Sequence, residues 1–350
     1  MFNVQIAHSV QEVGQEEWGR LGGEQPFASY RWVRLGETIL VDDQPLYVTL
    51  SRQGEPLARA MLWLRRQQNM LTSNQVVKSV LGAVLRRRPI LTCEAPLGNS
   101  AGLILPPEPT LREEALRTLS ACALDLARQN RASFLVFSYL PAADTRLPGW
   151  SDALIPIQFR NSGTVLPIAW DSFEGYLQGL SRWARKSVRQ NLRRAAEQGI
   201  VVREHPEVTD IEKALALIHN VDRQHNTAPN PQARSVLERA AMVDHVWLTA
   251  EVQGRTVGCA LLLADRGVMI QALLGLDYEV QYAYFALFYE TIRTAIERGQ
   301  KALRGGYAAY DMKRRLGFAV EDANQALFAG NGAFRSLGRW LAVSFQEEEL

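Results

Sequence analysis

Short apolar runs separated by turn residues fill the first half of the chain, together with one long amphipathic segment. Runs of roughly four to eight apolar residues between turn signals are typical of buried β-strands. Apolar residues three and four positions apart indicate a helix that buries one face. The pattern predicts strands at 46–50, 57–64, 90–93, 102–105 and 133–139, with a helix at 110–129.

The second half repeats this order with clearer turn signals. A Gln253-Gly254 turn joins two predicted strands, and Gly299 follows the last residue of a long helix. Because strands joined by short turns pair antiparallel, the fold class is predicted to be mixed α/β (α+β), with mostly antiparallel twisted sheets flanked by helices. The predicted strands are 246–252, 255–264, 268–274 and 302–304, with the helix at 282–298.

The two halves of the chain share the same order of predicted strands and helices, which predicts two domains. At 350 residues the chain has the length of two ordinary domains, taking roughly 150 residues for each. A loop-like Leu147-Pro148-Gly149-Trp150 stretch precedes the next apolar run, so we expect domains at 1–162 and 163–350.

Composition narrows the possible function classes. The formal charge is +2, so no global field favours DNA or a membrane surface. Cys93, Cys122 and Cys259 are far apart and lack metal-ligand spacing, so no metal site or disulfide scaffold is expected. The N-terminus lacks a signal-peptide pattern, and the apolar runs are too short for a transmembrane segment. We therefore expect a cytoplasmic protein; its oligomeric state is left open.

Four segments resemble a known family. Together they resemble the tandem acetyltransferase-like proteins of the GNAT superfamily that include the Fem-type peptidoglycan-bridge aminoacyltransferases. The resemblance implies two GNAT-like domains, with the active cleft in the second. It also implies transfer of an acyl or aminoacyl group from acyl-CoA or aminoacyl-tRNA to an amine acceptor, a cell-envelope component or a small metabolite. The segments are 26–32, 170–177 together with 185–194, the looser match 219–225, and 310–318, which reads YDMKRRLGF.

A basic helix capped by Ser181 is predicted, and it includes the segment 185–194. From Gly175 to Arg203 there are seven basic residues and one acid, Glu197, so salt bridges within the stretch do not account for the clustering. One guanidinium group can bind two phosphate oxygens at once, so this face can hold the phosphates of CoA, a nucleotide-linked substrate or tRNA. The alternative is a solvated face. The candidate phosphate-binding residues are Arg182, Arg185, Lys186, Arg189 and Arg193.

Three residues are candidates for catalysis. The resemblance implies that Lys313 lies beside the reaction centre, where an ammonium stabilises the oxyanion forming on the donor carbonyl. Tyr310, three residues earlier, can orient the acceptor or protonate the leaving group. His225 can act as a general base. The alternative for each is an ordinary surface or packing residue.

The donor and the activity itself stay open at this point. The loop 276–284 before the long helix has no glycine, whereas acetyl-CoA enzymes bind pyrophosphate there through a glycine-rich loop. No tightly bound cofactor is expected, with acyl-CoA as a possible co-substrate. The alternatives to a transferase are a catalytically degenerate module that binds a phosphate-bearing ligand or RNA, and a structural component of an envelope assembly.

Overall fold

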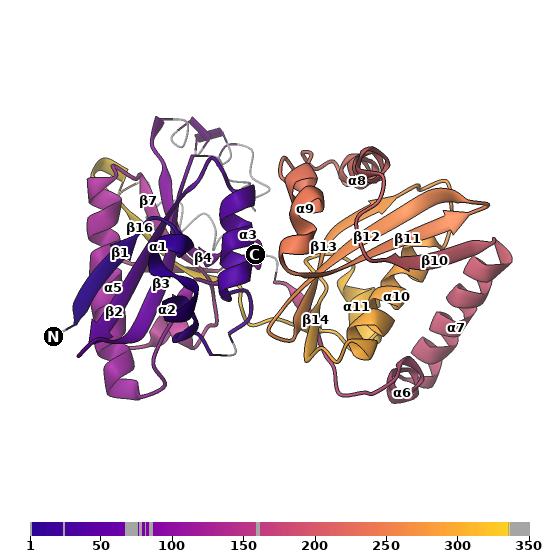
Figure 1. Cartoon of the computed structure of the whole chain (residues 1–350), viewed down its shortest axis with the longest axis horizontal. Coiled ribbons are helices and arrows are strands. Elements are labelled where there is room, and N and C mark those ends of the chain that lie inside the picture. Colours follow the sequence, from indigo (N-terminus) through magenta and orange to yellow (C-terminus); the bar gives the residue numbers. More distant parts are fainter. Residues whose placement is uncertain are drawn as a thin grey trace. The chain divides into compact units, whose positions relative to one another are not determined.

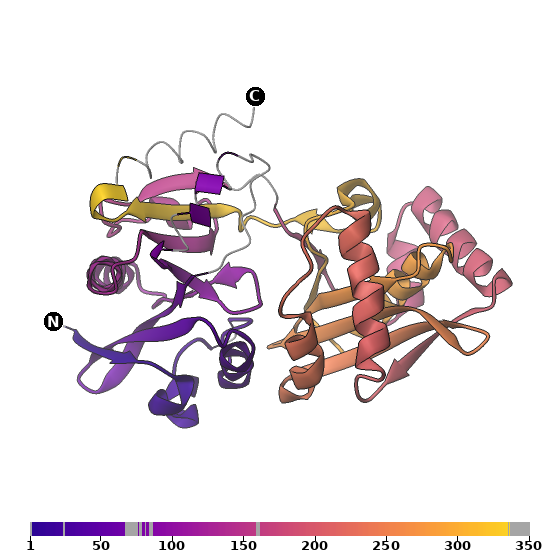
Figure 2. The same ribbon diagram turned by 90° about the horizontal axis from the view of Figure 1, so that it is seen from above.

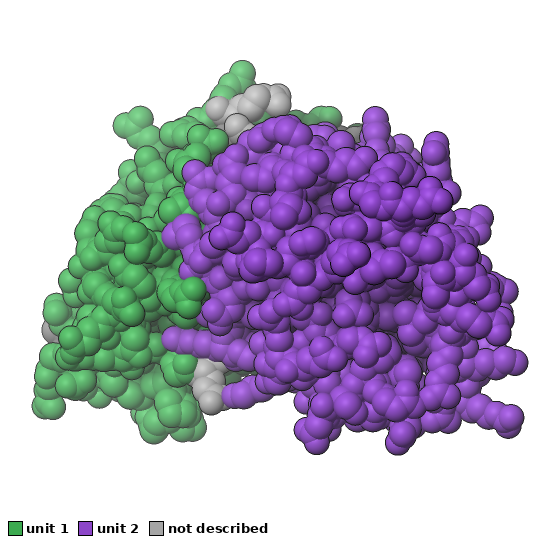
Figure 3. Space-filling model, turned by 45° about the vertical axis from the view of Figure 1, so that its right-hand side comes forward, with its two compact units in different colours: residues 1–162, 321–350 green, residues 163–320 purple. Residues whose placement is uncertain are grey.

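The computed structural model describes residues 2–23, 25–66, 76, 79–80, 82–83, 87–158, 162–334 and 336. The chain forms two compact units, coloured separately in Figure 3. Unit 1 contains Met1–Ser162 together with Glu321–Leu350, and unit 2 is Gly163–Val320. The expected second domain, 163–350, therefore includes a segment at its end that the structure assigns to unit 1.

Unit 1 is built on a mixed sheet with the strand order β1-β2-β3-β4-β7-β16-β8. Neighbouring strands pair antiparallel except β4 and β7, which are parallel. Two short strands, β5 and β6, pair with β4 and β3. The strands are β1 (Asn3–Ala7), β2 (Gln44–Arg52), β3 (Glu55–Arg65), β4 (Ile90–Ala95), β5 (Ser100–Ala101), β6 (Leu103–Ile104), β7 (Phe134–Leu140), β8 (Ile155–Gln158) and β16 (Gln325–Gly330).

Successive side chains on these strands alternate between two buried faces. Leu62 packs in the core cluster that includes α5, whereas Trp63 contacts α3 near Gly36. Ser29 caps α3 by accepting a hydrogen bond from the backbone N–H of Trp32 (3.2 Å). The helices of unit 1 are α1 (Val10–Val13), α2 (Gln15–Gly19), α3 (Tyr30–Ile39) and α5 (Pro109–Gln129), with short 3-10 turns η1 (Asp144–Arg146) and η3 (Gly332–Phe334).

Unit 2 has a second mixed sheet, with the order β10-β11-β12-β13-β14-β9-β15. Its pairs are antiparallel except β13 and β14, which are parallel. The strands are β9 (Thr164–Pro167), β10 (Ile200–His205), β11 (Asp244–Val252), β12 (Arg255–Asp265), β13 (Val268–Leu276), β14 (Ala302–Arg304) and β15 (Ala319–Val320). The helices are α6 (Phe173–Gly179), α7 (Arg182–Glu197), α8 (Ile211–Gln224), α9 (Ala233–Arg239), α10 (Ala283–Glu297) and α11 (Tyr310–Arg315), with the 3-10 turn η2 (Ala240–Met242).

Helices cover both faces of the second sheet (Figure 1). Gly258 of β12 faces Leu287 of α10, and α7 also packs on α10. On the other face, α8 crosses the sheet, where it contacts β13 and β12 (Figure 2). The core of unit 2 is the apolar layer between β11–β13 and α10, with contributions from α6 and α7.

Each sheet contains a strand from a distant part of the chain. β16 follows unit 2 in sequence, yet it lies between β7 and β8 of the first sheet. β9 follows β8 in sequence, yet it lies between β14 and β15 of the second sheet. This pairing explains why Glu321–Leu350 belongs to unit 1: the apolar side chains of β16 are buried in the first core.

The predicted mixed α/β class with two mostly antiparallel sheets is confirmed. None of the helices in the described part of the chain has the length and apolarity to cross a bilayer.

Candidate active site

Two parallel strands separate in the middle of the second sheet. β13 pairs with β14 only from Val268 to Ile270, although β13 continues to Leu276. A β-bulge at Ala272 marks the point of separation, since Leu261 pairs with Leu273 while Leu262 pairs with Gln271. Bulges bend a strand and are frequent beside active sites. Among the described strands, none pairs with this edge of β13 beyond the bulge, which leaves its backbone groups for another partner.

The corresponding place in unit 1 is filled by protein. β4 and β7 are parallel from Ile90 to Cys93, and β4 then pairs with β5 at Glu94 and Ala95. β5 also contacts β7, so it occupies the position where these strands would separate. Among the described strands, the second sheet therefore has an open edge at the position that β5 fills in the first.

A two-glycine turn follows β14 and approaches Lys313. A Cβ atom on Gly305 would lie 2.9 Å from Phe318 and 3.0 Å from the Thr164 hydroxyl, so only glycine fits there. Gly306 has a φ of 71°, in the left-handed region that glycine adopts without strain. The Thr164 hydroxyl donates to the Gly306 carbonyl at 2.9 Å, which fixes the turn.

The Lys313 ammonium is buried against this turn. Its side chain is 4% exposed, and Nζ donates hydrogen bonds to the carbonyl oxygens of Gly305 and Gly306, the latter at 3.4 Å. Burial lowers the pKa of the lysine from 10.5 to about 8. An ammonium has three N–H donors, so one stays unused by the described residues. The site thus holds a fixed positive charge with one free donor.

Tyr310 and Ala309 precede Lys313 at the start of α11. Tyr310 lies one helical turn before Lys313, which places both side chains on the same side of the helix. Burial raises the pKa of the Tyr310 phenol. Ala309 has a φ of 56°, an uncommon conformation for alanine. Such local strain clusters at functional sites, and here it turns the chain directly into the candidate catalytic helix.

His225 belongs to a different part of unit 2. It ends α8, which crosses the face of the sheet opposite α10, and its side chain is exposed. No described contact joins His225 to Lys313 or Tyr310. α8 touches the open strand through Asn220 instead, whose amide donates to the Leu276 carbonyl at 3.0 Å. Asp222 has one buried carboxylate oxygen, Oδ2, without a hydrogen-bond partner among the described residues.

The basic helix α7 is present, and its cations differ in their partners. Arg189 pairs with Glu174 of α6 at 2.5 Å, and Arg193 pairs with Glu197 at 3.3 Å. Salt bridges therefore account for part of the clustering, contrary to the expectation from the charge count, because Glu174 lies just outside the counted stretch. Arg185 donates to the Gln178 carbonyl at 3.2 Å. Arg182 and Lys186 are exposed and make no hydrogen bond or ion pair within the described part of the chain.

Two cations outside the five candidate residues connect α7 to neighbouring elements, the start of α10 and α11. Arg194 donates to the Tyr282 hydroxyl at 2.9 Å, beside the first residue of α10. Arg315 lies over the Trp183 ring, with 5.1 Å from its guanidinium carbon to the ring centre. The signal available for Arg315 was its place in the Lys313-Arg314-Arg315 run. The sequence around Trp183 does not predict this cation–π contact, because the contact joins segments far apart in the chain.

The loop before α10 is closed by its own hydrogen bonds. Asp277 accepts from Arg255 at 2.9 Å and from the backbone N–H of Glu279 at 3.1 Å. The backbone N–H groups of Asp277 and Val280 bond to Val257 and Asp277 carbonyls. The N–H groups of Asp277, Glu279 and Val280 are therefore already used, and the first turn of α10 has further backbone donors for an anion.

Comparison with known proteins connects this geometry to a family. The family model named FemAB-like, described as peptidoglycan biosynthesis/recognition, matches residues 9–347. The chain is similar in structure to FemX, with a TM-score of 0.61 and 13% identity over 93% of this chain and 97% of FemX. A search of curated protein sequences gives no match.

Two further solved structures share the two-unit architecture. A tandem GNAT protein from the clavulanic acid biosynthesis pathway has a TM-score of 0.54 and 13% identity, over 94% of this chain and 99% of that protein. The C-terminal domain of a putative lysylphosphatidylglycerol synthetase from Agrobacterium fabrum has a TM-score of 0.52 and 13% identity, over 96% of this chain and 95% of that domain. At this level of identity the likeness establishes the fold: two GNAT-like domains.

Proposed function

The chain belongs to the FemAB-like family of peptidoglycan biosynthesis/recognition proteins, and from this premise we propose that it is an N-acyltransferase or aminoacyltransferase. The donor is an activated acyl or aminoacyl group, carried by CoA or by tRNA. The acceptor is an amine of a cell-envelope precursor or a small metabolite. The reaction takes place in the cytoplasm, where both kinds of donor are made.

The buried ammonium of Lys313 carries this proposal. Attack of an amine on an acyl carbonyl places negative charge on the carbonyl oxygen, and a fixed donor at that oxygen lowers the barrier. Lys313 donates to the carbonyls of Gly305 and Gly306, and its third N–H has no partner in the described part of the chain. Because the ammonium is already desolvated, it needs no reorganisation when the oxyanion forms. Tyr310, on the same side of α11, protonates the leaving group or orients the amine.

The basic helix α7 supplies the proposed phosphate contacts. Arg182 and Lys186 are exposed and have no carboxylate partner among the described residues, so they are the first cations to meet a phosphate-bearing donor. Arg189 and Arg193 must leave Glu174 and Glu197 to bind phosphate. Exposed ion pairs contribute only about 0–1 kcal/mol, so this exchange costs little. Arg185 completes the proposed face.

A transfer assay tests the proposal. Radiolabelled acetyl-CoA, long-chain acyl-CoA and aminoacyl-tRNA are offered as donors, with a UDP-linked peptidoglycan precursor and a panel of small amines as acceptors. We expect Lys313→Met to lower kcat for the accepted pair by about 10²–10³-fold, the range for loss of one oxyanion donor. Arg314→Gln, on the same helix turn and 71% exposed in its side chain, should keep activity within a factor of two or so of the unchanged protein.

The alternatives predict other outcomes. A degenerate module binds a CoA ester or tRNA without turnover, and Lys313→Met leaves that binding unchanged. This alternative gains support from the two carbonyl contacts of Lys313, which also suit a purely structural lysine. A structural component of an envelope assembly binds neither donor. Equal turnover by Lys313→Met and Arg314→Gln would contradict the proposed role of Lys313.

A further inference from the structure

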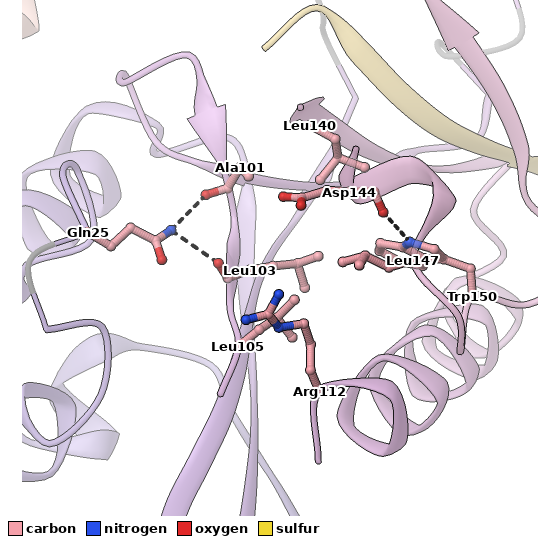
Figure 4. A pocket seen from close by; sticks show the side chains of 9 residues that line it. All are labelled: Gln25, Ala101, Leu103, Leu105, Arg112, Leu140, Asp144, Leu147 and Trp150. Carbon is pink, nitrogen blue, oxygen red and sulfur yellow. Dashed lines mark hydrogen bonds between the residues drawn. The ribbon is translucent and has the colours of Figure 1, made fainter. Parts of the chain in front are cut away.

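Unit 1 contains a small cavity beside the first turn of α5 (Figure 4). Its volume is about 270 Å³, slightly below the range of roughly 300–1,000 Å³ typical of pockets for drug-sized ligands. Leu103, Leu105 and Leu140 form apolar walls, with Trp150 on the side of η1. The Gln25 amide closes part of the rim, where it donates to the carbonyls of Ala101 (3.3 Å) and Leu103 (3.1 Å).

Two opposite charges line the same cavity as these leucines. Arg112 from α5 donates through Nε to the Pro106 carbonyl and through Nη2 to the Pro107 carbonyl, both at 3.0 Å. These bonds hold the guanidinium in place, and its Nη1 has no hydrogen-bond partner among the described residues. Asp144 is held by its backbone instead: its carbonyl accepts from the Trp150 indole at 2.8 Å.

The two charges attract each other without forming an ion pair. Burial raises the pKa of the Asp144 carboxyl, the positive charge of Arg112 lowers it, and Asp322 raises it. Yet no nitrogen of Arg112 comes within ion-pair distance of the Asp144 carboxylate in the described structure. Both side chains are only part-buried, so water meets the two charges that the protein leaves apart. A ligand that carries both a carboxylate and an ammonium can take the place of that water.

We propose that this cavity binds a free α-amino acid with an apolar side chain. The ligand carboxylate accepts from Nη1 of Arg112, and its ammonium donates to the Asp144 carboxylate. Its side chain packs against Leu103, Leu140 and Trp150. The ligand thus joins two charges that the protein leaves apart, and the volume excludes CoA or a nucleotide. The site lies wholly in unit 1, so it does not depend on the proposed transfer chemistry of unit 2.

Calorimetric titration of the full chain tests this site with three related probes. L-leucine carries both charges, 3-methylbutan-1-amine lacks the carboxylate, and 4-methylpentanoate lacks the ammonium. We expect L-leucine to bind at least about tenfold more tightly than either analogue, a difference of about 1.4 kcal/mol, because each analogue lacks one of the two charged hydrogen bonds. L-alanine and L-methionine extend the panel to smaller and longer side chains.

Variants assign each charge to its partner. Arg112→Gln should weaken binding of L-leucine and 4-methylpentanoate about tenfold and leave binding of 3-methylbutan-1-amine unchanged. Asp144→Asn should weaken binding of L-leucine and 3-methylbutan-1-amine about tenfold and leave binding of 4-methylpentanoate unchanged. Arg117→Gln and Asp125→Asn, exposed charges on α5, are the matched controls. Because Arg112→Gln also loses two carbonyl contacts, Leu147→Phe gives a second test: it fills the cavity with both charges retained, and should abolish binding.

Several outcomes would overturn the assignment. These are no saturable binding of any of the three amino acids, equal affinity for L-leucine and its analogues, or unchanged binding in folded Arg112→Gln, Asp144→Asn and Leu147→Phe proteins. Lys313→Met should bind L-leucine as the unchanged protein does. The site in unit 1 can therefore fail while transfer by unit 2 holds, and the reverse.

Discussion

The residues next to Lys313 in the sequence do not indicate that its side chain is buried. Arg314 is exposed, whereas Lys313 is buried by the turn at Gly305 and Gly306. Removing an ammonium from water is unfavourable, and two carbonyl oxygens offset only part of that cost. The remaining cost appears as the lowered pKa of about 8. A protein that keeps such a group retains a cation that a forming oxyanion stabilises further.

The lowered pKa predicts how transfer depends on pH. If the ammonium form acts, kcat should stay constant below pH 8 and fall as pH rises through about 8, where Lys313 loses its proton. Lys313→Arg, whose guanidinium stays charged, should lose this alkaline limb among the variants that keep activity. The measurement is a pH–rate profile of the accepted donor and acceptor. A rate that rises through pH 8 would instead make neutral Lys313 a general base.

The contribution of Lys313 to the free energy of unfolding changes with pH in the opposite direction from kcat, so a pH effect on transfer can be told apart from a pH effect on folding. Between about pH 8 and the unfolded pKa of 10.5, the unfolded chain binds more protons at this lysine than the folded chain does. The contribution of Lys313 to the free energy of unfolding therefore rises with pH in this window. A loss of activity above pH 8 cannot come from destabilisation by this group, and thermal unfolding at each pH provides the control.

At the scale of elements, α8 can approach β13 closely because β13 carries a glycine at the crossing. A Cβ atom on Gly275 would lie 2.7 Å from Cβ of Leu217 and 2.9 Å from the backbone nitrogen of Ile218. Backbone cannot move aside as a side chain can. The Asn220 amide, one turn after Leu217, then reaches the Leu276 carbonyl. The glycine therefore sets the position of α8 against the open edge of the sheet.

Gly275→Ala should lower the free energy of unfolding by about 1–3 kcal/mol, the usual cost of overpacking a tight contact. Gly258→Ala is the matched control on the neighbouring strand: its Cβ would meet the flexible end of Leu287, at 2.8 Å, so we expect a smaller loss. Chemical denaturation with unchanged m-values measures both. If Gly258→Ala costs as much as Gly275→Ala, the contact with the α8 backbone does not set the limit.

At the scale of the whole molecule, the sequence predicts what local patterns encode. β12, β13 and α10 were expected because turns and apolar periods mark them within a few residues. The return of β16 to the first sheet was not, since β16 pairs with β7 across almost two hundred residues. The candidate site shows the same limit. The motif around Lys313 could be identified in the sequence, whereas the contact of Lys313 with Gly305 depends on how β14 and α11 pack.

The sheet positions of β9 and β16 predict that buried residues of these two strands affect different sheets. Leu327 of β16 is 2% exposed in the first core, and Leu166 of β9 is fully buried in the second. Each leucine-to-alanine change should cost about 2–5 kcal/mol, as cavity-forming changes do. In native-state hydrogen exchange, Leu327→Ala should lower the protection of amides in β4 and β7 but not in β12. Leu166→Ala should lower the protection of amides in β12 but not in β4 and β7.

Val320→Ala, in β15 and 54% exposed, provides the control and should change protection by less than about 0.5 kcal/mol in either sheet. Equal loss of protection in β7 and β12 from Leu327→Ala would mean that the two units open together. Selective loss would mean that each sheet, the first with β16 included, is a separate unit of stability. In that case damage to the first sheet need not abolish transfer by the second, and assays of the Leu327→Ala protein would measure unit 2 while unit 1 is weakened.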